Sequence, residues 1–356
     1  MQNPFMTTFS KAPVYTYIPT EQADTIIEEL GYEFPTESVY KITGVRGSGK
    51  TVILAKIEEF YLQAAKNKDE WLVYRLSPSR DMLLQLAARL HKEKFVEHEP
   101  SSRSISVSAS VLGTGEGFGI SSTRDKAFFD IGAELEEMLV YAQKNQKKIL
   151  IGIDEVSKTD DMIKFASEFG KWLRAGYPVY LVCTGLYENI QELSNVKNLT
   201  FFRRALNIKT TPLNIVAMSE VYKNTLEIPR ETAVKLAKIT KGYAYAFQQL
   251  GATCFKGKNT ETISESIEKM KGELFAYSYE KIWEELSEGD RSFLKTIVDK
   301  SEYTREEIIQ KMGDKSGNYS VYRDRMLKRG LINAGNSTVS LALPFFGEYI
   351  KVYCYD

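Results

Sequence analysis

A glycine-rich loop that ends in a lysine and a threonine is the part of the sequence that most directly indicates chemistry. The loop reads Gly44-Val45-Arg46-Gly47-Ser48-Gly49-Lys50-Thr51 and fits the pattern G-x-x-x-x-G-K-[ST]. Its glycines let backbone N–H groups converge on phosphate oxygens, because no Cβ atom stands in the way. In this pattern the lysine reaches the β- and γ-phosphates, and the threonine hydroxyl binds Mg²⁺. We expect all eight residues to bind ATP, with Lys50 also catalytic; the alternative is a tight turn that matches by accident.

Two adjacent carboxylates follow an apolar segment farther along the chain. Asp154 and Glu155 come directly after residues 149–153, which are typical of a buried strand. A strand that ends in an acid places a carboxylate at the edge of the sheet, beside the metal ion of a bound nucleotide. We expect Asp154 to hold Mg²⁺ through water and Glu155 to polarise the attacking water as a general base. An acidic helix cap is the simpler interpretation, but the loop at 44–51 favours catalysis.

Three further residues lie where they could assist such a reaction. Thr184 ends the apolar segment 179–184 and could contact the γ-phosphate or position the water. It could equally cap a helix at 186–193. Arg203 and Arg204 precede a short strand and could present a guanidinium group to a nucleotide that a neighbouring subunit binds. A solvated pair of arginines on a loop is the alternative, and both questions stay open at this point.

The first part of the chain, residues 1–211, alternates predicted strands with predicted helices. This alternation indicates a parallel sheet with helices on both faces, and such sheets bind ligands at the carboxyl ends of their strands. Residues 103–122 alternate apolar and polar side chains around a Gly-rich turn, which predicts an inserted β-hairpin. The strands are expected at Val39–Thr43, Trp71–Leu76, Lys148–Ile153, 179–184 and Leu206–Lys209.

Helices dominate after Pro212. We expect a helical lid over residues 212–280 and a winged helix-turn-helix domain over residues 281–356. In the latter, helices are predicted at 287–299, 304–312 and 316–329, followed by a two-stranded wing at 331–343 and a last helix that begins at Pro344. Thr304 and Glu307 form a capping box for the second helix, and Gly330 ends the third.

The bulk composition excludes few functions but limits some. The 356 residues include 47 basic and 47 acidic side chains, so any nucleic-acid partner has to be held by a local basic face. The three cysteines are far apart and only two histidines occur, which makes a zinc site improbable. No apolar run is long enough to span a bilayer, and the N-terminus lacks a signal peptide's apolar core. We therefore expect a cytoplasmic protein without a membrane partner.

The order of these parts resembles the AAA+ class of P-loop ATPases, and more narrowly the branch of origin-binding initiators with their bacterial and archaeal relatives. Residues 44–51 match Walker A and residues 149–155 match Walker B, while Thr184 lies at the sensor-1 position. Arg203 and Arg204 lie near the arginine-finger box. The resemblance implies ATP as the nucleotide and conformational work on a macromolecule. Two departures stand out: Thr184 replaces the commoner asparagine, and Tyr245 stands in the place of the sensor-2 arginine.

The third helix of a winged helix-turn-helix is the one that enters the major groove of DNA. Here residues 315–329 contain five basic residues and one acidic residue, and Ser316, Asn318, Ser320 and Arg323 are candidates for contact with double-stranded DNA. Against this, residues 281–356 hold twelve basic and twelve acidic side chains, and winged helices also serve as protein-binding modules. Both interpretations remain open.

Two functions follow from these patterns. The leading hypothesis is an ATP hydrolase whose winged helix couples nucleotide state to contact with DNA or a protein. The alternative is a nucleotide-gated switch of the signalling or defence type, with slow turnover and a winged helix that makes protein contacts only. Either function is compatible with a homo-oligomer.

Overall fold

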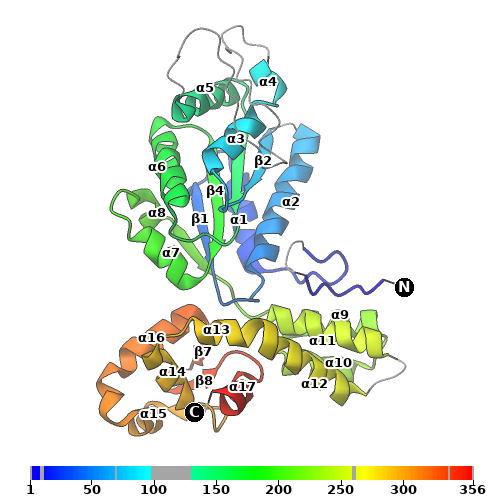
Figure 1. The fold of residues 1–356 in the computed structure, drawn as a ribbon. Helices are drawn as coiled ribbons and strands as arrows, with labels where there is room; N and C mark the ends of the chain where they lie inside the picture. Colours follow the sequence, from blue (N-terminus) through cyan, green and yellow to red (C-terminus); the bar gives the residue numbers. More distant parts are fainter. Residues whose placement is uncertain are drawn as a thin grey trace, which may run out of the picture.

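Five parallel strands form the sheet that carries the phosphate-binding loop (Figure 1). The fold is known from a computed structural model that describes residues 2–8, 12–68, 70–97, 130–258, 262–335 and 337–354. The hairpin expected at 103–122 lies outside these residues. The strands lie in the order β2-β3-β4-β1-β5. They are β1 (Val39–Thr43), β2 (Trp71–Leu76), β3 (Lys148–Ile153), β4 (Val179–Gly185) and β5 (Leu206–Lys209).

Helices cover both faces of this sheet, as the alternation of elements predicts. The side chain of Leu150 in β3 belongs to the core beneath one face, whereas those of its neighbours Ile149 and Ile151 belong to the core beneath the other. Burial on both sides explains why the central strands are almost continuously apolar. One core includes α1 (Glu21–Gly31) and α2 (Lys50–Lys68), and the other includes α3 (Met82–Leu90), α4 (Lys94–Glu97), α5 (Ile131–Lys144), α6 (Asp160–Ala175), α7 (Tyr187–Ser194) and α8 (Thr200–Arg204).

A glycine interrupts the apolar strand β3 because a glutamate from α2 crosses the strand at that point. A Cβ atom on Gly152 would lie 2.0 Å from Oε1 of Glu58. The buried Glu58 carboxylate accepts a hydrogen bond from Nε of Arg75 in β2 (3.0 Å). Burial raises the pKa of Glu58, while Arg75 acts in the opposite direction. This pair ties α2 to β2, the strand beside the one that precedes Asp154.

The chain after Thr211 is helical, with a small three-stranded sheet near its end. A π-helical turn at Phe275–Tyr279 joins two of these α-helices, and such turns are frequent at functional sites. The lid helices are α9 (Ile215–Leu226), α10 (Arg230–Ile239), α11 (Ala244–Gly257) and α12 (Ile263–Leu274), followed by the π-helix η2 (Phe275–Tyr279) and α13 (Glu280–Glu284). In the described parts of the chain, no helix has both the length and the apolar character needed to cross a membrane.

The last part has the arrangement of a winged helix-turn-helix. Three helices are followed by a wing, and the strands pair antiparallel in the order β6-β8-β7. Strand β6, between the first two helices, was not expected from the sequence. The third helix begins at Tyr319, later than predicted, because Gly313–Asn318 forms a 3-10 turn. The elements are α14 (Glu288–Lys295), β6 (Tyr303–Thr304), α15 (Arg305–Met312), α16 (Tyr319–Arg329), β7 (Ile332–Ala334), β8 (Thr338–Leu341) and α17 (Phe346–Tyr353).

Two local signals in this part have the structure that the sequence predicts. Thr304 and Glu307 form a reciprocal capping box at the start of α15. Gly330 ends α16 with a φ of +79°, in the left-handed region that glycine adopts most easily. Together they fix where the second helix begins and where the third helix stops.

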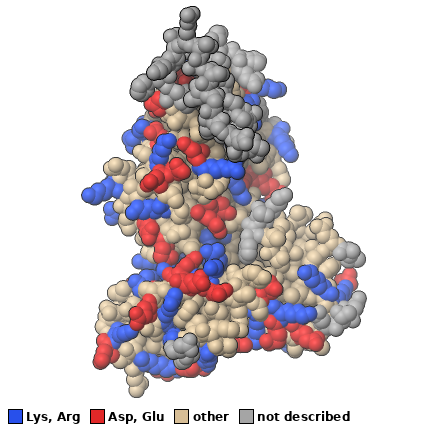
Figure 2. All heavy atoms as spheres, viewed as in Figure 1, with Lys and Arg blue, Asp and Glu red and all other residues tan. Residues whose placement is uncertain are grey.

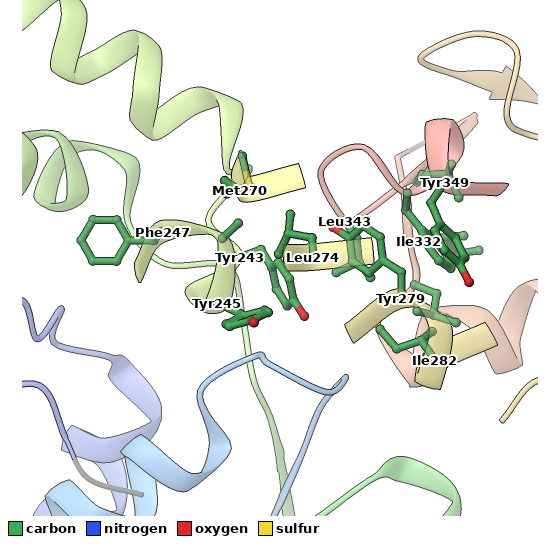
Figure 3. Close-up of a cluster of buried hydrophobic side chains, with 14 of the residues drawn as sticks. Tyr243, Tyr245, Phe247, Met270, Leu274, Tyr279, Ile282, Ile332, Leu343 and Tyr349 are labelled. Carbon is green, nitrogen blue, oxygen red and sulfur yellow. The ribbon is translucent and has the colours of Figure 1, made fainter. Parts of the chain in front are cut away.

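The lid helices and the winged helix share one hydrophobic core. Figure 3 shows Phe247, Met270 and Leu274 of the lid continuing into Tyr279 of η2 and Leu343 near the C-terminus. The buried Tyr279 hydroxyl also donates a hydrogen bond to the Pro344 carbonyl. A movement of one part is therefore transmitted to the other by direct packing.

Candidate nucleotide-binding site

The lysine of the glycine-rich loop is buried at the start of α2. Its Nζ atom donates hydrogen bonds to the carbonyl oxygens of Gly44 (3.1 Å) and Val45 (3.0 Å), so the ammonium group points to the first turn of the loop. Burial lowers the pKa of Lys50 to about 8, and the carboxylates of Asp154 and Glu155 act in the opposite direction. The loop thus encloses a cation that lacks a carboxylate contact, as an anion-binding site requires.

The glycines of the loop are required by its conformation and by close neighbours. Gly47 and Gly49 have φ values of +76° and +94°, which strain any other residue. A Cβ atom on Gly47 would lie 2.3 Å from Oη of Tyr243, and one on Gly44 would lie 2.0 Å from Oγ1 of Thr210. The glycines therefore allow Tyr243 and Thr210 to approach the backbone of the loop closely.

Asp154, Glu155 and Thr184, three of the residues expected to act on the nucleotide, lie together at the ends of β3 and β4. The hydroxyl of the fully buried Thr184 donates a hydrogen bond to the Asp154 carboxylate. The same oxygen accepts a hydrogen bond from the backbone N–H of Glu155 (3.1 Å), which has a left-handed φ of +56°. Thr184 does not cap the next helix, because the cap position of α7 is Leu186 and makes no side-chain cap bond. The helix-cap interpretation of Thr184 is therefore wrong, and its role towards the phosphate or the water stays a prediction.

The two arginines on α8 are placed by a buried lysine in β1. Nζ of Lys41 donates a hydrogen bond to the Phe202 carbonyl (2.6 Å) and lies 5.2 Å from the centre of the Phe202 ring. Arg203 and Arg204 follow and are exposed, and neither forms an ion pair within the described residues. They do not join the cluster around Lys50. Their guanidinium groups are available to a molecule outside this chain.

A largely apolar cavity lies beside the second half of the loop, between the N-terminal segment and the lid. It encloses about 730 Å³ and is open to solvent. Gln248 ties the N-terminal segment to the lid, because its Oε1 accepts from the Met6 N–H (2.9 Å) and its Nε2 donates to the Thr16 carbonyl (3.2 Å). No sequence motif marks this cavity. It is lined by Met6, Thr8, Pro13, Thr16, Tyr17, Ile18, Thr20, Gly47, Ser48, Gly49, Val52, Ile53, Thr211, Leu213, Ala244, Tyr245 and Gln248.

A second, smaller cavity of about 290 Å³ lies beside the first half of the loop. Gly44, Val45 and Arg46 form one wall, and residues of α7 and of the winged helix form the others. Two ion pairs cross between these walls: Arg46 with Glu285 (Nη2 to Oε1, 3.0 Å) and Arg329 with Glu188. Figure 2 shows acidic and basic side chains close together between the part that holds the sheet and the helices of the C-terminal part.

The comparisons with known proteins agree with this architecture. Residues 276–350 match the model of a family described as a domain of unknown function, DUF8462. No curated protein matches the sequence. Among solved structures, the Walker-type ATPase PABY2304 of Pyrococcus abyssi is similar, with a TM-score of 0.61, 12% identity, and coverage of 93% of this chain and 95% of that chain. The chain therefore has the fold of this Walker-type ATPase, with the parallel α/β sheet of a P-loop protein.

A second solved structure has a similar fold. The Aeropyrum pernix ORC2 protein, solved in ADPNP–ADP complexes, has a TM-score of 0.58 and 13% identity, with 94% of this chain and 95% of that chain covered. These identities are too low to transfer more than the fold. Both similarities extend over nearly the whole chain, including the helical parts after the sheet.

The lid contacts the glycine-rich loop through two tyrosines. The Tyr243 hydroxyl donates to the Arg46 carbonyl (2.7 Å) and exchanges a hydrogen bond with the Ser278 hydroxyl (2.7 Å). The backbone N–H of Tyr245 donates to the Gly47 carbonyl (3.1 Å). Burial raises the pKa of Tyr243, so this phenol stays protonated and able to donate. Contact between lid and loop thus uses hydroxyl and backbone groups rather than an arginine.

The residues expected to contact DNA lie at the beginning of the third winged-helix helix. Asn318 and Ser320 are exposed, Ser316 is half-buried, and Arg323 pairs with Asp324 (3.2 Å). Two of the basic residues farther along α16, Arg325 and Arg329, form ion pairs within the protein, whereas Lys328 is exposed. Arg325 donates through Nε to the buried Asp290 (2.7 Å), Arg329 pairs with Glu188, and Lys328 lies 5.9 Å from the Tyr187 ring centre. The positive charge of this helix is therefore partly used within the protein.

Proposed function

We propose that the protein binds ATP with Mg²⁺ at residues 44–51 and hydrolyses it. The observation that supports this most strongly is the grouping of Lys50, Asp154, Thr184 and Glu155 at one edge of the sheet. Lys50 brings a buried cation that phosphates can neutralise, and the acid pair is held in place by Thr184. A lone glycine-rich loop would fit many nucleotide-binding proteins, but this grouping favours a hydrolase.

The residues present fit the ligands that this function requires. The loop offers backbone N–H groups and an ammonium group to the phosphates, and the apolar cavity beside Gly47 is suited to a flat base. Thr51 and Asp154 supply the oxygen ligands that Mg²⁺ prefers, with water completing the shell. Bound Mg²⁺ neutralises charge on the β- and γ-phosphates.

Each side chain has a distinct role in the proposed reaction. Glu155 accepts a proton from the attacking water as the general base, because the neighbouring Asp154 is assigned to Mg²⁺. Thr184 orients Asp154 and Glu155 through its two hydrogen bonds. Lys50 stabilises negative charge that grows on the transferred phosphoryl group. Arg203 and Arg204 act on a nucleotide bound by a neighbouring copy of the chain, which is compatible with their exposure.

The parts after the sheet convert nucleotide state into altered partner contact. We assign residues 1–211 to the ATPase domain, 212–280 to the lid and 281–356 to the winged-helix domain. In the first form of the proposal, Ser316, Asn318, Ser320 and Arg323 contact double-stranded DNA. In the second form, a slow switch, the winged helix makes protein contacts only, and the inward pairing of Arg325 and Arg329 favours it.

Nucleotide titration tests the shared part of the proposal. The full chain is titrated with ATP and Mg²⁺ while phosphate release is followed, and Lys50→Ala is expected to lose both signals. A Lys50→Ala variant that bound ATP as tightly as the original chain would contradict the assignment of residues 44–51.

Salt dependence separates the two forms. Phosphate contacts make the logarithm of the DNA-binding constant fall linearly with the logarithm of the salt concentration. Arg323→Gln removes one such contact and should make the slope smaller by about one. No binding to duplex DNA at low salt would favour the switch.

A further inference from the structure

The two cavities beside the glycine-rich loop correspond to the two ends of a nucleotide. Gly47, Ser48 and Gly49 line the large apolar cavity, whereas Gly44, Val45 and Arg46 line the small charged one. Nζ of Lys50 points to the carbonyls of Gly44 and Val45. Because this lysine contacts the β- and γ-phosphates, the terminal phosphate belongs at the small cavity and the base at the large one.

One wall of the small cavity is supplied by the winged helix. Arg329, the last residue of α16, has only 14% of its side chain exposed and lines the cavity opposite Gly44. Its Nε pairs with Glu188 in α7, and its Nη1 donates to the Glu285 carbonyl (3.3 Å). The Nη2 group makes no hydrogen bond to the described residues, which leaves donors of this guanidinium unused.

Without a bound phosphate, the positive and negative charges around the small cavity are equal in number. Arg46 and Arg329 face Glu285 and Glu188, and the Nε–H of Arg46 is buried without a partner in the part of the chain described. A triphosphate brings more negative charge to this wall than a diphosphate does. Guanidinium groups bind phosphate oxygens in a bidentate manner, so a terminal phosphate competes well with Glu188 for Arg329.

We propose that Arg329 of the winged helix binds the terminal phosphate of a nucleoside triphosphate held by the same chain, and so distinguishes triphosphate from diphosphate. This inference rests on the proposed nucleotide binding at residues 44–51. When the terminal phosphate is present, Arg329 exchanges its contact with Glu188 for contact with the phosphate. Since α16 ends at Arg329 and α7 follows Thr184 closely, this exchange changes how the winged helix is held against the sheet.

The test compares two nucleotides on the full chain. ADP and the non-hydrolysable analogue AMP-PNP are titrated calorimetrically in the presence of Mg²⁺. Arg329→Gln is expected to raise the Kd for AMP-PNP about tenfold and to change the Kd for ADP by less than about twofold. Arg329→Lys keeps the charge but loses the planar fork, so its loss of AMP-PNP affinity is smaller.

Two further variants fix the interpretation. Arg305→Gln changes an exposed arginine elsewhere in the winged-helix domain, and it should leave both affinities unchanged. Glu188→Gln removes the carboxylate that competes for Arg329 and should tighten AMP-PNP binding without affecting ADP. A gain of affinity cannot arise from a damaged fold, so this variant keeps the test decisive if Arg329→Gln folds poorly.

The possible failures are distinguishable. An original chain that binds neither nucleotide overturns the proposed function itself. If the original chain binds ADP and AMP-PNP, but Arg329→Gln weakens the two affinities equally or leaves both unchanged, then Arg329 does not distinguish the terminal phosphate. Weaker AMP-PNP binding by Glu188→Gln would also overturn the inference.

Discussion

The phenolic hydroxyl of Tyr243, in the turn before α11, donates a hydrogen bond to the carbonyl oxygen of Arg46 in the glycine-rich loop, over 2.7 Å. The same hydroxyl is bonded to Ser278 in the π-helix that leads to the winged helix. One buried group therefore links the phosphate-binding loop to the helices that carry the C-terminal part. A ligand that displaces the loop at Arg46 therefore changes the length of this hydrogen bond.

Removing this hydroxyl should loosen the link. Tyr243→Phe keeps the ring in the core but leaves the Arg46 carbonyl and the Ser278 hydroxyl without a shared partner. The free energy of unfolding, measured with urea, should fall by about 1–3 kcal/mol. Tyr277→Phe is the control, because Tyr277 is 65% exposed and its hydroxyl is accessible to water. Equal effects of the two changes would show that the buried hydrogen bond adds nothing.

Replacing Gly47 should lower the affinity for ADP far more than the positive φ angle of this residue alone would suggest. Gly47→Ala introduces a Cβ atom 2.3 Å from Oη of Tyr243 and forces the lid away from the loop. Gly176→Ala provides the control, since Gly176 has nearly the same φ, +77° against +76°, but no atom within 4 Å of an added Cβ. We expect Gly176→Ala to cost about 1 kcal/mol of stability and to leave ADP affinity intact. Gly47→Ala should lower ADP affinity more than about tenfold by calorimetry, and equal ADP affinities for both variants would contradict this account.

The affinity for ADP should depend on pH through Lys50. Burial lowers the pKa of this lysine to about 8, and phosphate binds the protonated ammonium form. Below pH 8 the proton is already present in the free protein, so affinity is constant as far as Lys50 is concerned. Above pH 8 binding must take up a proton, so the affinity falls by up to about tenfold for each further pH unit. Calorimetry between pH 7 and pH 10 measures this, with adenosine as the control that lacks phosphates; an ADP affinity that rises across this range would contradict it.

The ion pair between Arg325 and Asp290 should hold the winged helix together. Asp290 is 1% exposed, and Arg325→Met would leave its carboxylate buried without a cation. We expect the free energy of unfolding to fall by about 2–3 kcal/mol, less than for a fully buried pair because Arg325 is partly exposed. Arg323→Met, whose exposed partner Asp324 keeps its water, should change stability by less than about 0.5 kcal/mol. Thermal or urea denaturation of both variants provides the comparison.

Local patterns were sufficient to predict the sheet and most of the helices. Strands β1, β2, β3 and β5 have the predicted bounds. The first three are largely buried, whereas β5 is an edge strand whose side chains are mostly exposed. The capping box at Thr304 and the left-handed Gly330 depend on neighbours within a few residues, and both are present. Information of this kind is contained in the sequence itself.

Features that depend on distant contacts could not be predicted in the same way. Tyr243 and Arg46 are separated by 197 positions, and neither pattern indicates the other. The apolar cavity draws on an N-terminal segment without a motif, and the inward position of Arg329 depends on how the winged helix packs on α7. For Thr184 the sequence allowed two interpretations, and the structure excludes only the helix cap, because Thr184 bonds to Asp154 instead.

The proposed hydrolysis is tested most directly by ATP turnover and ATP binding measured together on one variant, Glu155→Gln. The substitution removes the proposed general base and leaves the loop and Lys50 unchanged. We expect ATP to bind within about threefold of the original affinity while phosphate release falls at least about a hundredfold, the size of a general-base contribution. Phosphate release by Glu155→Gln at the rate of the original chain would contradict the account.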